Sequence, residues 1–182
     1  KYDSIHGNFG SLVKSGGNYI KINKEKISYT QHSTINDIKW KKYGVDYVFE
    51  CTGKFNSKDQ LLPHIENGVK KVIVSAPCKM ADKTIVFGVN HKKINKNDRI
   101  ISAASCTTNC LAPVADVINK KFIILSGFMT TIHAFTSDQR ILDNSHKDPR
   151  RARSASQSIV PTSTGASKAI GEIIPSLKGK LE

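Results

Sequence analysis

The sequence is poor in closely spaced glycines. Its twelve glycines never occur two positions apart, so the pattern G-x-G-x-x-G occurs nowhere in the 182 residues. That pattern forms the tight phosphate-binding turn of dinucleotide-binding folds. The chain therefore lacks the usual glycine-rich turn for a dinucleotide pyrophosphate.

Long hydrophobic runs and paired cysteines are also scarce. No apolar run approaches the roughly 20 residues of a membrane span, so no membrane association is expected. Four cysteines without a secretory signal do not indicate a disulfide framework. The spacing of Cys106 and Cys110 is not the usual zinc pattern, so no metal site is predicted. We expect reduced thiols and a cytoplasmic location.

Acidic residues are few, 15 against 28 Lys and Arg, which gives a net charge of +13. Such a charge raises the hypothesis of a nucleic-acid-binding module. The lysines are scattered, however, and no aromatic side chains alternate with them to form a base-stacking surface. We therefore expect a solvated basic surface and no nucleic acid partner. The alternative predicts salt-dependent RNA affinity that survives Cys106→Ala.

The hydrophobic pattern indicates an α/β fold. Gly16-Gly17 and the alternating residues 18–23 predict a hairpin strand. Residues 45–50 and 72–75 read as buried parallel strands on either side of a helix over 58–67, which is capped by Ser57 and ended by Gly68. Further strands are predicted over 85–89 and 99–102. By the crevice rule for such sheets, Thr52, Gly53 and Ser75 lie near a ligand.

The second half of the chain reads differently. A helix is predicted from Ser105 to about residue 119, with Leu111, Val114, Ala115 and Ile118 on one face. A long strand over 122–135, a long loop over 136–163 and a helix over 166–174 follow. A loop of that length within a compact domain is usually functional.

Cys106 and His133 are the candidate catalytic pair. Cys106 lies where a strand gives way to a helix, and His133 lies on the next predicted strand. A helix N-terminus and an imidazole both lower a thiol pKa, and sites of this kind reach roughly 3.5–7.5. The backbone N–H groups of the helix start would also bind an oxyanion. The alternatives are a buried cysteine with a hydrogen-bonded strand histidine, or a Cys/His acyltransferase or hydrolase.

The residues around Cys106 resemble a known signature. The run from Ala104 to Val114 is similar to the active-site sequence of the phosphorylating glyceraldehyde-3-phosphate dehydrogenases. Weaker similarities occur in the family's order along the whole chain, at residues 2–7, 49–53, 75–77, 87–90, 146–148 and 161–166.

The resemblance implies an incomplete Rossmann-like domain over 1–104 and the first part of an α+β catalytic domain over 105–182, including the family's S-shaped loop. It implies NAD as cofactor, and a homotetramer as the assembly. Asn144-Ser145 resembles the NADP-using plastid type, so NADP stays an alternative. The glycine-rich turn would lie before residue 1 and further binding residues after residue 182, so we expect these residues alone not to turn over.

The resemblance also implies a reaction. Cys106 would attack the aldehyde of glyceraldehyde 3-phosphate, and His133 would act as base. Inorganic phosphate would cleave the thioester to 1,3-bisphosphoglycerate. The substrate phosphate would lie near Thr136 and Asp138. The attacking phosphate would bind Ser105, Thr107, Arg153, Thr164 and Gly165, and the cofactor would lie against Thr52, Gly53, Phe55 and Ser75. Erythrose-4-phosphate dehydrogenase is a close alternative.

Overall fold

The computed structural model describes residues 2–182, which form two compact units divided between Lys39 and Trp40. The first unit contains a three-stranded antiparallel sheet in the order β1 (Val13–Gly16), β2 (Tyr19–Ile22) and β3 (Glu25–Ser28). Strand β1 turns into β2 at Gly17, so the predicted hairpin strand is confirmed. A short 3-10 helix, η1 (Ile35–Asp37), follows the sheet.

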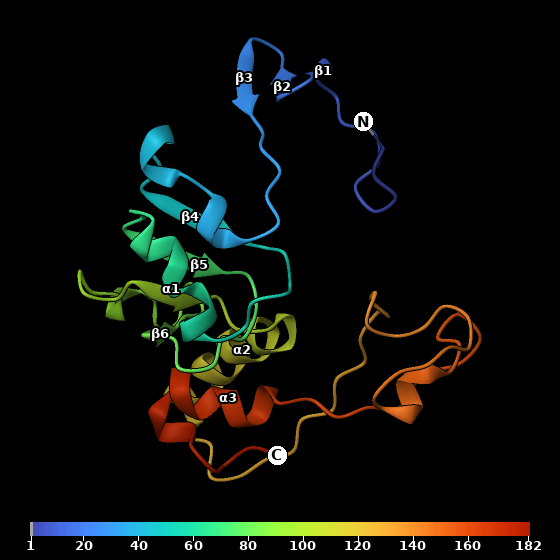
Figure 1. The fold of residues 1–182 in the computed structure, drawn as a ribbon. Helices are drawn as coiled ribbons and strands as arrows, with labels where there is room; N and C mark the ends of the chain where they lie inside the picture. The colour runs from blue at the N-terminus through green and yellow to red at the C-terminus, as the bar shows by residue number, and fades with distance from the viewer. Residues whose placement is uncertain (1) are drawn as a thin grey trace. The chain divides into compact units, whose positions relative to one another are not determined.

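The second unit is built on a four-stranded parallel sheet (Figure 1). The strands lie in the order β4 (Tyr47–Glu50), β5 (Lys71–Val74), β7 (Ile100–Ser102) and β6 (Lys83–Thr84). Glu50 is level with Val74, and Val74 with Ser102, so β4, β5 and β7 end along one edge. The predicted strands over 45–50, 72–75 and 99–102 are therefore confirmed.

Helix α1 (Lys58–Glu66) connects β4 to β5 and packs on the sheet. It begins after Ser57, as predicted, although the Ser57 hydroxyl donates to Gln60 Oε1 rather than capping the backbone. The helix ends before Gly68, whose φ of +100° is a conformation that glycine adopts without penalty. Side chains two residues apart on a strand share a face, so Val48 and Glu50 both point toward this helix. Leu61 and Ile65 of α1 meet Val48, Val72, Val74 and Ile100 there.

Helices α2 (Cys106–Phe122) and α3 (Ala166–Ile173) lie side by side (Figure 1). Their shared core comprises Ala112 and Ala115 of α2, Ile170 and Ile173 of α3, and neighbouring residues Val86, Ala104, Ile174 and Leu177. The residues buried on α2 are Thr108, Ala112 and Ala115. The predicted apolar face is therefore only partly right, because Val114 and Ile118 are exposed.

Two predicted strands are not formed. Residues 85–89 make a turn, because the Asn90 side chain accepts from the Val86 N–H (2.8 Å) and donates to the Thr84 carbonyl (2.9 Å). The Ile85 N–H still donates to the Ser102 carbonyl, and after it the Asn90 hydrogen bonds take the place of strand pairing. The segment 122–135 continues α2 to Phe122 and then runs without strand structure. Its only ladder contact in the described chain is an isolated bridge between Gly127 and Leu181.

The remaining elements are short. They are the 3-10 helices η2 (Trp40–Tyr43), η3 (His91–Lys93), η4 (Pro149–Ala152) and η5 (Pro175–Leu177). Apart from η4, residues 136–163 form the long loop that the sequence predicts. Within residues 2–182, no helix has both the length and the apolar character needed to cross a membrane.

Candidate active site

Cys106 is the first residue of α2, directly beyond the end of β7. Ser105 caps the helix by accepting from the Thr108 N–H at 3.1 Å, as its residue type favours. The turn before it is held by Asn109, whose amide donates to the carbonyls of Ala103 (2.7 Å) and Ser105 (2.9 Å). Ala104 has a φ of 60°, which is costly for a residue with a Cβ. A strained and clamped turn therefore presents Cys106 at the helix N-terminus.

His133 meets Cys106 from the segment after α2. Its Nε2 lies 3.3 Å from the Cys106 Sγ, and its Nδ1 lies 2.6 Å from the carbonyl oxygen of Ala134. A carbonyl only accepts, so Nδ1 carries a proton and donates. Nε2 is thus free to accept the thiol proton, after which the imidazolium donates to the thiolate. The structure therefore places the side chains of Cys106 and His133 in contact, as the sequence predicts.

The electrostatics favour the ion pair. The hydrogen bond from His133 lowers the pKa of Cys106, and contacts with Thr107 add to this, against the opposing effect of burial. The Ala134 carbonyl, followed by the Cys106 sulfur, raises the pKa of His133. Both shifts favour thiolate beside imidazolium. Both residues are exposed, so a substrate can reach the sulfur.

The predicted phosphate-binding residues lie in three places. Ser105 and Thr107 flank Cys106, and the Thr107 hydroxyl is 4.0 Å from the sulfur. Thr164 and Gly165 precede α3, where the Thr164 hydroxyl accepts from the Ala166 N–H. The third place is the long loop, which carries Thr136, Asp138 and Arg153.

The loop residues have partners of their own. Arg153 pairs with Asp143 at 2.9 Å. Asp138 accepts from Arg151 and lies 3.5 Å from His146 Nε2. Burial raises the pKa of Asp138, but these hydrogen bonds outweigh it and lower the pKa overall. In the described chain, no hydrogen bond or ion pair joins these loop residues to Cys106 or His133.

The predicted cofactor residues gather at the ends of β4 and β5. Thr52 and Gly53 follow β4, and Ser75 follows β5, where its hydroxyl donates to the Glu50 carbonyl at 3.2 Å. Thr52, Gly53 and Ser75 are exposed, and nothing lies within 4 Å of where a Gly53 Cβ would be. Exposed hydroxyls beside an open glycine suit the adenosine part of a dinucleotide. Phe55 packs partly buried against the core under α1.

Several features were not predicted. The clamp by Asn109 and the buried Glu50 have no signal in a single sequence beyond their polar residue type. The hydroxyl of Thr108 is buried and contacts Ser105, so it is unavailable to a ligand. Cys110, one helical turn after Cys106, is exposed as well. No group of three potential metal ligands occurs among residues 2–182.

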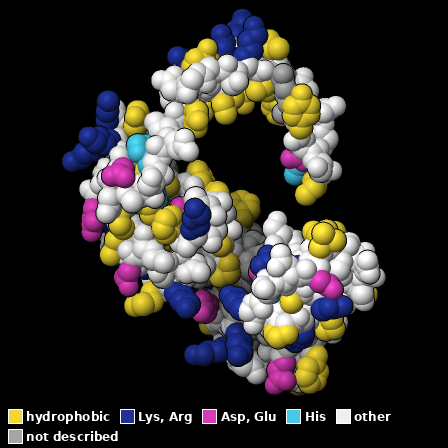
Figure 2. Space-filling view, turned by 45° about the vertical axis from the view of Figure 1, so that its right-hand side comes forward, with side chains coloured by type: hydrophobic (Ala, Val, Ile, Leu, Met, Phe, Trp, Pro, Cys, Tyr) yellow, Lys and Arg dark blue, Asp and Glu magenta, His cyan; other side chains and the backbone are white. Residues whose placement is uncertain are grey.

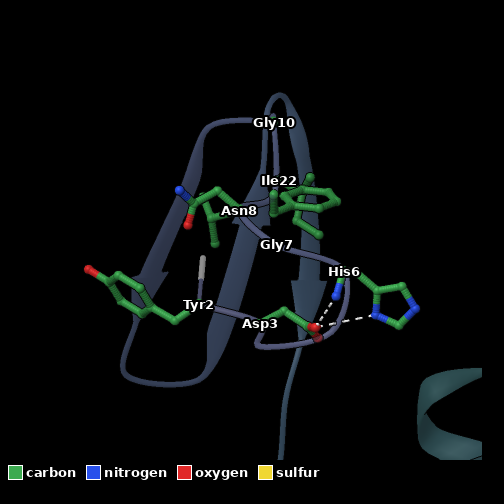
Figure 3. A pocket seen from close by; sticks show the side chains of 9 residues that line it. Tyr2, Asp3, His6, Gly7, Asn8, Gly10 and Ile22 are labelled. Atoms are coloured by element: carbon green, nitrogen blue, oxygen red, sulfur yellow. Dashed lines mark hydrogen bonds and ion pairs between the residues drawn. The ribbon is translucent and has the colours of Figure 1, made fainter.

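Two hollows are lined by residues other than those predicted to bind phosphate or cofactor. One, of about 420 Å³, is lined by Arg140, Ser145, His146 and Lys147. The other, of about 540 Å³, lies within the N-terminal unit (Figure 3). There the Asp3 carboxylate accepts from the Ile5 and His6 N–H groups. On the face drawn in Figure 2, Lys and Arg side chains are spread over the surface in small groups.

Comparison with known proteins identifies the family. The model of the glyceraldehyde 3-phosphate dehydrogenase C-terminal domain matches residues 105–182, and that of its NAD binding domain matches residues 1–58. The chain belongs to the glyceraldehyde-3-phosphate dehydrogenase family. This confirms the resemblance carried by the Cys106 signature, and with it the α/β fold class.

Curated relatives align along the whole chain. Glyceraldehyde-3-phosphate dehydrogenases of Zymomonas mobilis and Cereibacter sphaeroides are 51% and 49% identical to it, and glyceraldehyde-3-phosphate dehydrogenase 2 of Bacillus subtilis is 50% identical. Each alignment covers 100% of this chain and 54% of the relative. The chain therefore spans about half the length of these relatives.

Proposed function

We propose that this chain carries the nucleophile and the base of a phosphorylating aldehyde dehydrogenase. The reaction is oxidation of D-glyceraldehyde 3-phosphate, with inorganic phosphate, to 1,3-bisphosphoglycerate in glycolysis. The cofactor is NAD, with NADP as the alternative. The observation that carries the proposal is the 3.3 Å contact between Cys106 Sγ and His133 Nε2 at the start of α2. Family membership supports the substrate and the cofactor.

Cys106 acts as the thiolate in this scheme. Its sulfur attacks the aldehyde carbon, and the N–H groups at the start of α2 stabilise the negative oxygen. His133 protonates that oxygen from Nε2 to give a hemithioacetal on Cys106. It then takes the hydroxyl proton back as the carbon is oxidised to a thioester. NAD supplies the hydride acceptor for that oxidation. Phosphate attack on the thioester releases the Cys106 thiolate.

The remaining site residues bind phosphate and cofactor in this proposal. Thr136 and Asp138 act at the substrate phosphate. Asp138 does so indirectly, because its carboxylate pairs with Arg151 and orients that side chain beside the phosphate. Residues Ser105, Thr107, Arg153, Thr164 and Gly165 serve the attacking phosphate, and Thr52, Gly53, Phe55 and Ser75 the adenosine side of the cofactor.

We further propose a domain boundary between residues 104 and 105, a homotetramer and a cytoplasmic location. The family model that begins at residue 105 supports the boundary. Exposed Phe128 (89%), Ile132 (93%) and Ile159 (88%) support burial against a neighbouring subunit or further chain. Four free cysteines support a reducing compartment.

A chimera tests the reaction, in which this chain replaces the matching residues of the Bacillus subtilis relative. Cys106→Ser should abolish phosphate-dependent NAD reduction with glyceraldehyde 3-phosphate, and Cys110→Ser should retain it. Acyl transfer or hydrolysis without nicotinamide would instead favour the Cys/His transferase or hydrolase. A higher kcat/KM for erythrose 4-phosphate would favour the sibling dehydrogenase. Equal activity of the two serine variants would contradict the role of Cys106.

A further inference from the structure

A chain of polar side chains lies buried beneath the end of β4. Glu50, the last residue of β4, is 5% exposed, and His64 of α1 is 3% exposed. Their side chains face each other, with His64 Nε2 at 3.7 Å from Glu50 Oε2. On the other side of the ring, Trp40 Nε1 donates to His64 Nδ1 at 3.0 Å. Burial of this kind is costly unless the groups are matched, so the arrangement calls for a function.

The indole fixes the protonation of the histidine. Trp40 Nε1 can only donate, so His64 Nδ1 must accept and cannot carry a proton. The ring is therefore neutral, with its proton on Nε2, directed toward Glu50. Burial lowers the pKa of His64 despite the nearby carboxylate, which agrees with a neutral ring. His64 Nε2 has no partner within hydrogen-bond distance in the described chain.

The other oxygen of Glu50 holds the turn that follows β4. Oε1 accepts from the Thr52 backbone N–H at 2.8 Å and from the Thr52 hydroxyl. The Thr52 hydroxyl in turn accepts from the Lys54 N–H at 3.2 Å, and Gly53 between them has a φ of +72°. One buried carboxylate therefore fixes the backbone of the turn. This is the turn assigned above to the cofactor.

We propose that Glu50, the buried last residue of β4, is a positioning residue for cofactor binding. It holds Thr52 and Gly53 in the conformation that receives the adenosine side of NAD. The inference rests on the proposed function, because it takes that turn as part of the cofactor site. Glu50 is buried behind the turn and acts through Thr52 rather than by touching the cofactor.

Glutamine at position 50 tests the proposal, because it has the shape of glutamate but one acceptor oxygen. If that oxygen faces Thr52, the amide NH₂ faces the His64 Nε2–H, and two donors meet. The histidine cannot move its proton to Nδ1, because the Trp40 N–H occupies that side. Trp40→Phe removes this block, so in the double variant His64 Nε2 can accept from Gln Nε2. Trp40→Phe alone is the matched control.

The measurement is steady-state kinetics with NAD in the chimera described above. Glu50→Gln should raise the KM for NAD about tenfold, in keeping with the cost of a buried unsatisfied group, and leave kcat nearly unchanged. Trp40→Phe alone should stay within about threefold of wild type. The double variant should recover most of the loss. The proposal is overturned if Glu50→Gln leaves the KM for NAD unchanged or lowers only kcat. It is also overturned if the double variant does not recover the KM for NAD.

Hydrogen exchange of the Thr52 amide separates this proposal from the reaction itself. Glu50→Gln should speed exchange at Thr52, and the double variant should slow it again, whether or not the protein reduces NAD. A wild-type chimera without NAD reduction means that the proposed function fails. Faster Thr52 exchange with an unchanged KM means that Glu50 holds the turn but does not serve the cofactor, which also overturns this inference.

Discussion

Replacing His133 with asparagine removes the imidazole from the Cys106 sulfur and leaves the N-terminus of α2 in place. The hydrogen bond from His133 is the largest cause of the lowered pKa of Cys106. The thiol pKa should therefore rise toward its ordinary value of roughly 8.5, at which only about 3% is thiolate at pH 7. The reactivity of Cys106 at low pH is the quantity that should change.

The size of the change follows from two opposing effects. Each unit of increase in pKa lowers the thiolate fraction about tenfold at pH values below both pKa values. It also raises the intrinsic nucleophilicity of the thiolate about threefold, so the net loss of rate is about threefold per unit. Water screens the exposed Cys106–His133 pair. We therefore expect alkylation at pH 6 to slow about three- to tenfold.

The assay is iodoacetamide alkylation of the intact chain between pH 5 and 10, with each cysteine followed by peptide mass spectrometry. In His133→Asn the inflection for Cys106 should move to higher pH, and the two profiles should converge or cross near pH 10. Exposed Cys110 is an internal reference, and His32→Asn, an exposed histidine in the other unit, is the control variant. Superimposable Cys106 profiles would refute the reasoning from geometry to thiolate.

Three further outcomes follow from the packing and the caps. Leu61→Ala, at a fully buried site, should lower the free energy of unfolding in urea by about 2–5 kcal/mol, whereas Leu62→Ala, at a site 36% exposed, should cost less than about 1 kcal/mol. Ser105→Ala should cost about 1 kcal/mol in the same measurement, because the cap of α2 is lost. Hydrogen bonds from Arg150 lower the pKa of Asp148 from 3.8 to about 2. The ionised Asp148 carboxylate therefore stabilises the folded state fully above pH 3.8, and this stabilisation is lost as the pH falls through about 2. The protection factor of the Arg150 amide, which donates to Asp148, should fall over that range, and a constant value would contradict the shift.

The parallel sheet could be predicted because its signals are local. Short apolar runs that alternate with a capped helix indicate βαβ structure from residue type alone, and Ser57 and Gly68 mark the two ends of α1. The prediction of a strand over 85–89 is wrong because Asn90, just after this apolar run, forms competing hydrogen bonds. Asn90 satisfies Val86 and Thr84 through its side chain, and sequence alone does not say whether an asparagine caps a turn or faces solvent.

The site was predictable to the same degree. Cys106 and His133 carry their chemistry in their residue types, so their pairing could be anticipated. The support behind them could not, because Asn109 and Glu50 act through contacts that depend on the fold. Glu50 is an acidic residue at a strand end, which a single sequence does not distinguish from an exposed one. In the fold, Glu50 is buried and its carboxylate accepts from the Thr52 N–H, which holds the turn after β4.

The missing strand over 122–135 bears directly on the contact between Cys106 and His133. An apolar strand pattern predicts only that one face of the segment is buried. Strand structure also requires a neighbouring segment with free backbone N–H and C=O groups. In the described chain, backbone pairing with residues 180–182 reaches only Gly127 and Met129, and Phe128 and Ile132 are 89% and 93% exposed. His133 belongs to this segment, so its position rests on its own contacts with Ala134 and Cys106. A partner strand supplied by further chain would fix the backbone of His133 and lower the entropy cost of the ion pair. The geometry of the Cys106–His133 pair and the pairing of this segment would then be coupled through His133.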